Sequence, residues 1–108
     1  MLTEELKQIS NKLVDVLSPN RIYLFGSYAN NTYTSDSDYD LYIVCPDNAG
    51  DAISLSQLGY HSLRGIRTKP VDILVGFESN FKERKLLPTI EQEVSRTGVL
   101  LYEKRSAC

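Results

Sequence analysis

Apolar residues in the first seventeen positions recur at intervals of three and four, which is the period of a helix with one buried face. These residues are Leu6, Ile9, Leu13, Val16 and Leu17. Thr3 precedes them as a capping residue, and Pro19 follows them as a residue that cannot continue a helix. The pattern therefore predicts an amphipathic helix from Thr3 to Leu17.

Four short runs rich in aliphatic and aromatic residues predict β-strands. The runs are Arg21–Phe25, Tyr39–Cys45, Val71–Val75 and Val99–Tyr102. Gly26-Ser27 breaks the first run with a tight turn, and Pro46 ends the second.

Helical patterns fill the intervals between the later strands, over Ala52–Leu63, Phe81–Leu87 and Thr89–Thr97. Gly59 is expected to interrupt or weaken the first of these, Pro88 separates the other two, and Gly98 is placed as a C-terminal stop. Strands that alternate with helices indicate an α/β or α+β fold in which helices pack against one sheet. No linker divides the pattern, so we expect a single domain over residues 1–108. The pattern does not give the order or direction of the strands.

The composition is that of an ordinary globular chain, with 42% apolar and 24% charged residues, so a core can form. A formal net charge of -2, without a stripe of Lys and Arg, argues against a surface that binds long nucleic acid. A nucleotide is compatible with this charge, because metal ions and a few cations can neutralise its phosphates locally.

The first residues, Met1–Leu6, lack the basic segment and apolar run of a secretory signal, and no stretch approaches the length of a membrane span. Cys45 lies within an apolar run and Cys108 is the last residue, which gives neither a disulfide framework nor a zinc-type spacing. We therefore interpret both as free thiols and expect a cytoplasmic protein with no membrane partner.

Two carboxylates lie at the start of the second predicted strand, Asp38 directly before it and Asp40 as its second residue. Residues two apart on a strand point to the same face, so Asp38 and Asp40 project together with Cα atoms about 6.6 Å apart. Adjacent like charges are unfavourable unless a cation neutralises them, and Mg²⁺ binds oxygen ligands of this kind. The pair predicts a magnesium site, and the alternative is a polar strand end that faces solvent.

Asp72 is a candidate third ligand because it interrupts the apolar run Val71–Val75, where packing alone would not place a charge. A buried and structurally paired carboxylate would give the same pattern. If its strand neighbours the one that carries Asp38 and Asp40, three carboxylates can hold two metal ions roughly 3.5–4 Å apart. Asp72 can also accept the proton of an attacking hydroxyl.

The turn at Gly26-Ser27 is a candidate phosphate site, since its backbone N–H groups and the Ser27 hydroxyl can meet phosphate oxygens. Cations before the third strand, at Arg64, Arg67 and Lys69, can reach phosphates or a partner protein, although a solvated loop explains them equally well.

A calcium-binding EF-hand loop starting at Asp36 is the competing interpretation of the acidic run. Its sixth position would be Leu41 instead of Gly, and its twelfth Asp47 instead of Glu. The pattern therefore does not support this loop, and we interpret Asp36 as a solvated loop residue.

These motifs together resemble the nucleotidyltransferase superfamily of DNA polymerase β, and in particular its minimal, antitoxin-type members. The shared pattern is a hydrophobic residue with Gly-Ser, then a spacer and Asp-hydrophobic-Asp-hydrophobic, and a third Asp on a later strand. It is matched by Phe25-Gly26-Ser27, Asp38-Tyr39-Asp40-Leu41 and Val71-Asp72-Ile73. The resemblance extends from the first helix to Glu103 and implies a mixed β-sheet of about four strands flanked by helices.

The resemblance also implies roles for individual residues. Asp38, Asp40 and Asp72 would be the catalytic carboxylates that bind two Mg²⁺ ions, and Gly26 and Ser27 would bind the triphosphate. Many relatives have Arg-Gly where this chain has Asn30-Asn31. Asn tolerates a left-handed backbone better than most residues, so we expect Asn31 to preserve the turn.

The function implied is Mg²⁺-dependent transfer of a nucleoside monophosphate, AMP from ATP, to a hydroxyl on a protein or small molecule. The implied partner is a helical toxin of the HEPN type, which the chain would neutralise as its antitoxin. Two alternatives stay open. One is an antitoxin-like binding module with a retained nucleotide site, which Asn30-Asn31 favours; the other is an enzyme resembling aminoglycoside nucleotidyltransferases, which would need an additional acidic cleft.

Overall fold

The computed structural model describes residues 3–34, 37–66 and 69–105. Asp36, Arg67 and Cys108, which the sequence analysis interprets, lie outside these ranges. The elements follow in the order α1 (Glu4–Leu17), β1 (Arg21–Phe25), β2 (Tyr39–Cys45), α2 (Ala52–Ser62), β3 (Val71–Phe77), α3 (Glu78–Arg84), α4 (Ile90–Thr97) and β4 (Val99–Glu103).

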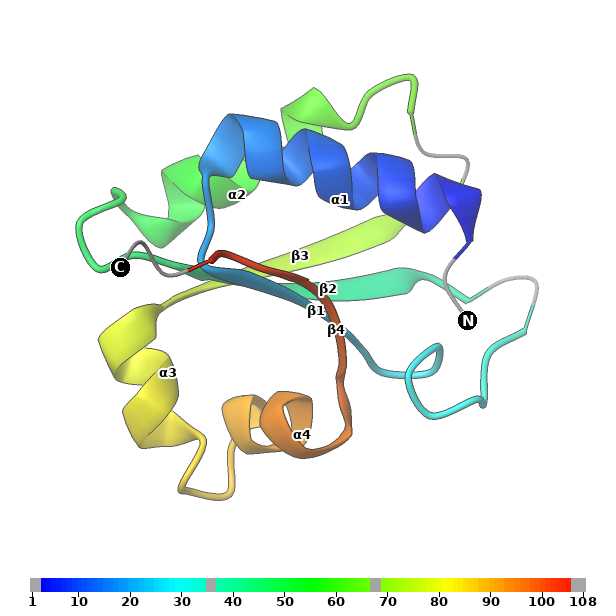
Figure 1. Ribbon diagram of the computed structural model, residues 1–108. Helices are drawn as coiled ribbons and strands as arrows, with labels where there is room; N and C mark the ends of the chain where they lie inside the picture. Colours follow the sequence, from blue (N-terminus) through cyan, green and yellow to red (C-terminus); the bar gives the residue numbers. More distant parts are fainter. Residues whose placement is uncertain (1–2, 35–36, 67–68, 106–108) are drawn as a thin grey trace.

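The strands form one mixed sheet in the order β3-β2-β1-β4. β1 pairs antiparallel with both β2 and β4, whereas β2 and β3 are parallel. A parallel pair needs a long crossover connection, which α2 supplies here. Figure 1 shows α1 and α2 covering one face of the sheet and α3 and α4 the other. The expected fold, a mixed four-stranded sheet flanked by helices, is confirmed.

Side chains alternate between two cores, one on each face of the sheet. Along β2, Leu41 and Ile43 pack toward α1 and α2, whereas Tyr42 and Val44 pack toward α3 and α4. Because both of its faces are covered, almost every residue of β2 is buried, which explains its continuous apolar sequence.

The first helix begins and ends as its sequence suggests. The Thr3 hydroxyl accepts the N–H of Leu6 at 3.1 Å, which confirms Thr3 as the N-cap. At the other end, Ser18 adopts a left-handed conformation and donates its N–H to the Val14 carbonyl before Pro19.

Two predicted elements have bounds that differ from the structure by more than one residue, and one interpretation of a glycine was wrong. β3 continues two residues beyond Val75, because the ladder with β2 extends to the pair Cys45 and Phe77. The helix predicted over Phe81–Leu87 is α3, which begins at Glu78 and ends at Arg84. The glycine is Gly59, which does not interrupt α2: the helix continues through it, the residue is buried, and a Cβ there would lie 3.2 Å from Ile73 Cδ1. Glycine thus lets α2 pack closely on the sheet.

The outer edge of β3 is bound by a side chain from α2. Tyr60 accepts the backbone N–H of Ile73 through its hydroxyl, at 2.8 Å. Since β3 is an outer strand of the sheet, this donor would otherwise face solvent. Among the helices of the described ranges, none is both long and apolar enough to cross a membrane.

Candidate active site

A short turn after β1 carries the predicted phosphate-binding residues. Gly26 has a φ of +73°, in the left-handed region that favours glycine. The turn is closed by two backbone hydrogen bonds, from Asn30 N–H to the Gly26 carbonyl at 3.1 Å and from Thr32 N–H to the Ser27 carbonyl at 3.0 Å. A short polar loop therefore follows directly from the end of the strand.

Two features favour glycine at position 26: its left-handed backbone and the close approach of a neighbouring side chain. A Cβ at this position would overlap the carboxylate of Asp40 on β2. Phe25, one residue earlier, is paired with Asp40 across the β1 and β2 ladder. The turn and the acidic strand are thus in direct contact, which the sequence spacing alone does not reveal.

Asn31 has a φ of +58°, so it adopts the left-handed backbone expected of it. Asn is one of the few residues other than glycine that occupy this region at low cost. The conformation expected of Asn31, which stands where many relatives are expected to have glycine, is confirmed. Asn30, at the position of their arginine, is exposed to solvent.

Asp40 and Asp72 are brought together by the parallel pairing of β2 and β3. Their Cα atoms are partners in the ladder, so their side chains emerge on the same face of the sheet. That face is the one covered farther along by α3 and α4, because Tyr39 and Ile73 occupy the core under α1 and α2. Asp40 is half-buried, and Asp72 is exposed.

The electrostatics of Asp40 show that the three predicted carboxylates share one region. Burial raises the pKa of Asp40, and the charges of Asp72 and Asp38, together with hydrogen bonding to Asp72, raise it further. Asp38 precedes β2 and is half-buried. Asp40 is therefore the central member, with Asp72 across the ladder and Asp38 two residues before it.

The carboxylate oxygens of Asp38, Asp40 and Asp72 are the candidate ligands for Mg²⁺. Within residues 3–34, 37–66 and 69–105, no three His, Cys, Asp or Glu side chains stand as a group that could hold a metal ion. The donors nevertheless have the chemistry of Mg²⁺ ligands, because they are carboxylate oxygens whose mutual repulsion a cation would relieve. The ligand type of Asp38, Asp40 and Asp72 is therefore suitable for Mg²⁺.

The site includes an apolar residue that the sequence analysis did not select. Leu74 lies two residues after Asp72 on the same face of β3, and 42% of its surface is exposed. An exposed leucine beside acidic residues offers a nonpolar contact for a bound ligand. The signal was the alternation along β3, which places residues 72 and 74 on one face.

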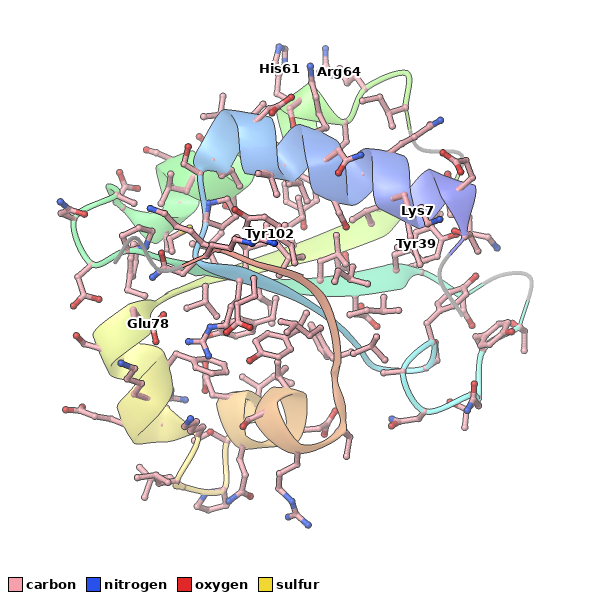
Figure 2. The ribbon with its side chains drawn as sticks, viewed as in Figure 1. Lys7, Tyr39, His61, Arg64, Glu78 and Tyr102 are labelled. Carbon is pink, nitrogen blue, oxygen red and sulfur yellow. The ribbon has the colours of Figure 1, made fainter. Side chains whose placement is uncertain are left out.

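Two of the predicted cations before β3, Arg64 and Lys69, lie within the described residues, and neither is placed at the carboxylates. Arg64 is exposed, and Figure 2 shows it with His61 beyond the helical layer of α1 and α2, away from the sheet. Lys69 instead lies near Tyr28, with its ammonium 5.8 Å from the ring centroid.

A mixed sheet with helices on both faces, and with acidic residues on two parallel strands beside a Gly-Ser turn, has the nucleotidyltransferase fold. The chain belongs to the family described as polymerase beta, nucleotidyltransferase, whose sequence model matches residues 4–107. No curated protein matches the chain at a significant level.

Two solved structures are similar to the chain. One is a protein from Sulfolobus solfataricus assigned as a nucleotidyltransferase, with a TM-score of 0.64, 21% identity, and coverage of 94% of this chain and 79% of the other. The second is a toxin-antitoxin with AMP-PNP, with a TM-score of 0.64, 22% identity, and coverage of 92% and 74%. At this level of identity the two structures support the fold.

Proposed function

We propose that this protein is a Mg²⁺-dependent nucleotidyltransferase that moves AMP from ATP to a hydroxyl group of a partner protein. The observation that carries the proposal is the register of Asp40 with Asp72, directly beside the Gly26-Ser27 turn. Carboxylates grouped next to a phosphate-binding turn suit transfer between a triphosphate and a hydroxyl, because both reactants can be held at one place. The proposal includes a cytoplasmic location, because ATP is the proposed donor.

Binding of the triphosphate is the role proposed for the turn. The Ser27 hydroxyl and the backbone N–H groups at the start of the turn would contact phosphate oxygens. Asp38, Asp40 and Asp72 would hold Mg²⁺, two ions by the family pattern. When bound, Mg²⁺ neutralises charge on the phosphates and on the carboxylates.

Transfer requires that a proton leave the acceptor hydroxyl. Asp72 is the exposed carboxylate of the set and can accept that proton. The acceptor oxygen forms a bond to the α-phosphorus, the bond between that phosphorus and the β-phosphate oxygen breaks, and pyrophosphate leaves. Leu74 would contact the acceptor or the nucleoside from the same face.

A protein acceptor is the substrate class that we favour, and a helical toxin of the HEPN type is the proposed partner. The support is the resemblance to antitoxin-type members of the family and the similar fold of a toxin-antitoxin with AMP-PNP. The chain would then act as an antitoxin, either by modifying the toxin or by binding it.

Labelled ATP tests the proposal directly. The protein is incubated with Mg²⁺, ATP labelled at the α-phosphate, and the protein encoded beside it. Transfer of label is expected for wild type, and Asp40→Asn should lower its rate by on the order of 10²-fold or more. Asp15→Asn, at an exposed position on α1, is the matched control and should transfer at the wild-type rate. Label transfer that survives Asp40→Asn would contradict the proposal.

A binding module without chemistry is the second candidate, and one observation favours it. Asn30 provides no positive charge where relatives have arginine, so one source of phosphate binding is missing. A stable complex with the neighbouring protein and no transfer of label, at any ratio of Mg²⁺ to ATP, would support this alternative.

A further inference from the structure

Aromatic and cationic side chains form a cluster on the face of the sheet opposite the carboxylates. The ring of Tyr28 lies between two others: Tyr33 stacks on it with centroids 4.4 Å apart, and Tyr39 contacts it at 4.7 Å. The ammonium of Lys69 is 5.8 Å from the same ring. Tyr28, Tyr33, Tyr39 and Lys69 are called the back cluster below.

Each of the three segments that form the candidate site also contributes one residue to the back cluster. That residue is near the predicted site residue in the sequence. Tyr28 follows Ser27, and Tyr39 lies between Asp38 and Asp40. Lys69 lies three residues before Asp72. The three segments therefore contact one another on both faces of the sheet. The carboxylates lie on one face, and the back cluster lies on the other.

Tyr39 is the fixed member of the back cluster. Its side chain is only 2% exposed, and its hydroxyl donates to Glu5 Oε1 in the first turn of α1 at 3.1 Å. Figure 2 shows Tyr39 on the α1 side of the sheet. Because neighbouring residues on a strand point to opposite faces, an anchored ring at position 39 directs Asp40 to the other face.

Tyr28 lies in the turn that follows β1, and this turn belongs to no strand or helix. The hydrogen bonds of this turn, from Asn30 to Gly26 and from Thr32 to Ser27, close within it and give it shape. The pairing of Phe25 with Asp40 holds the start of the turn, at Gly26, against β2. Beyond Gly26 the contact between the rings of Tyr28 and Tyr39 joins the rest of the turn to that strand. A cavity of about 210 Å³ borders the rings, so a smaller side chain at position 28 would leave room for the turn to shift.

We propose that Tyr28 is a positioning residue whose ring, held against Tyr39, sets the position of the turn after Gly26, and with it Ser27, relative to the carboxylates of β2. Lys69 links the same ring to the segment that enters β3. The effect on a ligand rests on the proposed function, because the quantity positioned is the triphosphate site relative to Asp40. The positioning itself is a property of the protein without ligand.

Three variants separate positioning from simple loss of packing. Tyr28→Leu removes the ring, and Tyr28→Phe keeps the ring while removing the hydroxyl. Tyr23→Leu is the matched control, because Tyr23 is also half-buried and stacked, on Phe81 at 5.8 Å, but in the core on the other side of the sheet. Thermal unfolding of all three gives the loss of stability that each causes.

The first measurement is the affinity for AMP-PNP with Mg²⁺, by calorimetry. Tyr28→Leu is expected to bind at least about tenfold more weakly, because a displacement of about 1 Å strongly lowers the effect of oriented groups. Tyr28→Phe should stay within about twofold of wild type, and so should Tyr23→Leu despite its loss of stability. Equal affinities for Tyr28→Leu and Tyr23→Leu would overturn the proposal.

The second measurement uses no nucleotide. Residual dipolar couplings from ¹H-¹⁵N spectra report bond orientation and do not sense the magnetic field of the ring. They should change at Ser27 in Tyr28→Leu and keep the wild-type values in Tyr28→Phe. If wild type does not bind AMP-PNP, the proposed function fails, and these couplings still decide whether Tyr28 positions the turn. Unchanged couplings at Ser27 in Tyr28→Leu would mean that it does not.

Discussion

Asp40 and Asp72 emerge on the same face of the sheet from Cα atoms that are paired across β2 and β3. A one-residue slip of either strand would turn one of them to the opposite face. The pairing therefore depends on register, which the apolar partners Leu41 with Ile73 and Ile43 with Val75 fix within the core. Packing on one face of the sheet thus sets the chemistry on the other.

Asp40 is expected to make the metal-free protein less stable as the pH rises. Its pKa lies above the ordinary value of 3.8, chiefly through burial and then through the charges of Asp72 and Asp38. Over the interval above 3.8 the folded state binds more protons than the unfolded state, so the free energy of unfolding falls with increasing pH. Asp40→Asn should remove this dependence and raise the melting temperature at pH 7.

Thermal unfolding between pH 3.5 and 7 checks this difference, with Asp15→Asn as the surface control. Added Mg²⁺ should stabilise wild type at pH 7 and have a smaller effect on Asp40→Asn. Parallel pH profiles for wild type and Asp40→Asn would show that the carboxylates do not interact.

Gly26→Ala should be more destabilising than alanine at another glycine with similar backbone. The left-handed backbone alone costs about 1–2 kcal/mol for a residue with a Cβ, and at Gly26 that Cβ also overlaps the Asp40 carboxylate. Gly65 has a φ of +80°, and a Cβ added there would meet nothing within 4 Å, so Gly65→Ala reports backbone strain alone. Urea unfolding of both gives the contribution of the contact, and equal losses would argue against it.

Asn31→Gly should preserve or slightly raise stability, whereas Asn31→Ala should lower it by about 1 kcal/mol. The reason is the φ of +58°, which glycine adopts freely and alanine does not. Asn30→Ala, on the neighbouring exposed residue, serves as the control and is expected to stay within about 0.5 kcal/mol of wild type. Melting curves for the three variants are sufficient, and the reverse order for Gly and Ala would exclude a role for this backbone angle.

Glu91 should contribute stability that is lost in acid. Burial alone would raise its pKa, but hydrogen bonds from Tyr42 at 2.8 Å and from Arg84 at 2.9 Å outweigh burial and lower it. A carboxylate with a lowered folded pKa stabilises the protein above its unfolded pKa, and this stabilisation disappears as the pH falls through the folded value. Glu91→Gln should cost about 1–3 kcal/mol at pH 7.

The difference between wild type and Glu91→Gln in urea unfolding should shrink from pH 7 toward pH 3. Glu93→Gln, on the exposed side of the same helix, provides the comparison and should behave as wild type at both pH values. If Glu91→Gln lowers the free energy of unfolding equally at pH 7 and pH 3, the hydrogen bonds from Tyr42 and Arg84 do not depend on ionised Glu91.

Local sequence signals predicted the first half of the fold well. β1 and β2 have the bounds that their apolar runs suggested, because Gly26 and Pro46 interrupt them clearly. The N-terminus of α3 was placed three residues late for a physical reason. Phe77 precedes this helix without a side-chain capping hydrogen bond, so the sequence carries no capping signal there.

The candidate site was only partly predictable. The spacing of Asp38 and Asp40 is local, and the charge of Asp72 within an apolar run marks an unusual position. That Asp40 and Asp72 are partners depends on a parallel pairing between segments separated by α2, which periodicity does not determine. The contact of Gly26 with Asp40 and the stacking of Tyr28 on Tyr39 are likewise tertiary features. The catalytic and metal-binding roles of the three carboxylates stay predictions.

The hydroxyl of Tyr60 has a consequence for how copies or partners can associate. β3 and β4 are the outer strands, and open backbone donors on such strands invite a strand from another chain. At Ile73 the donor is already occupied, so a strand added to β3 would have to displace Tyr60. The hydroxyl of Tyr60 therefore opposes the addition of a foreign strand at the edge of the sheet that carries Asp72.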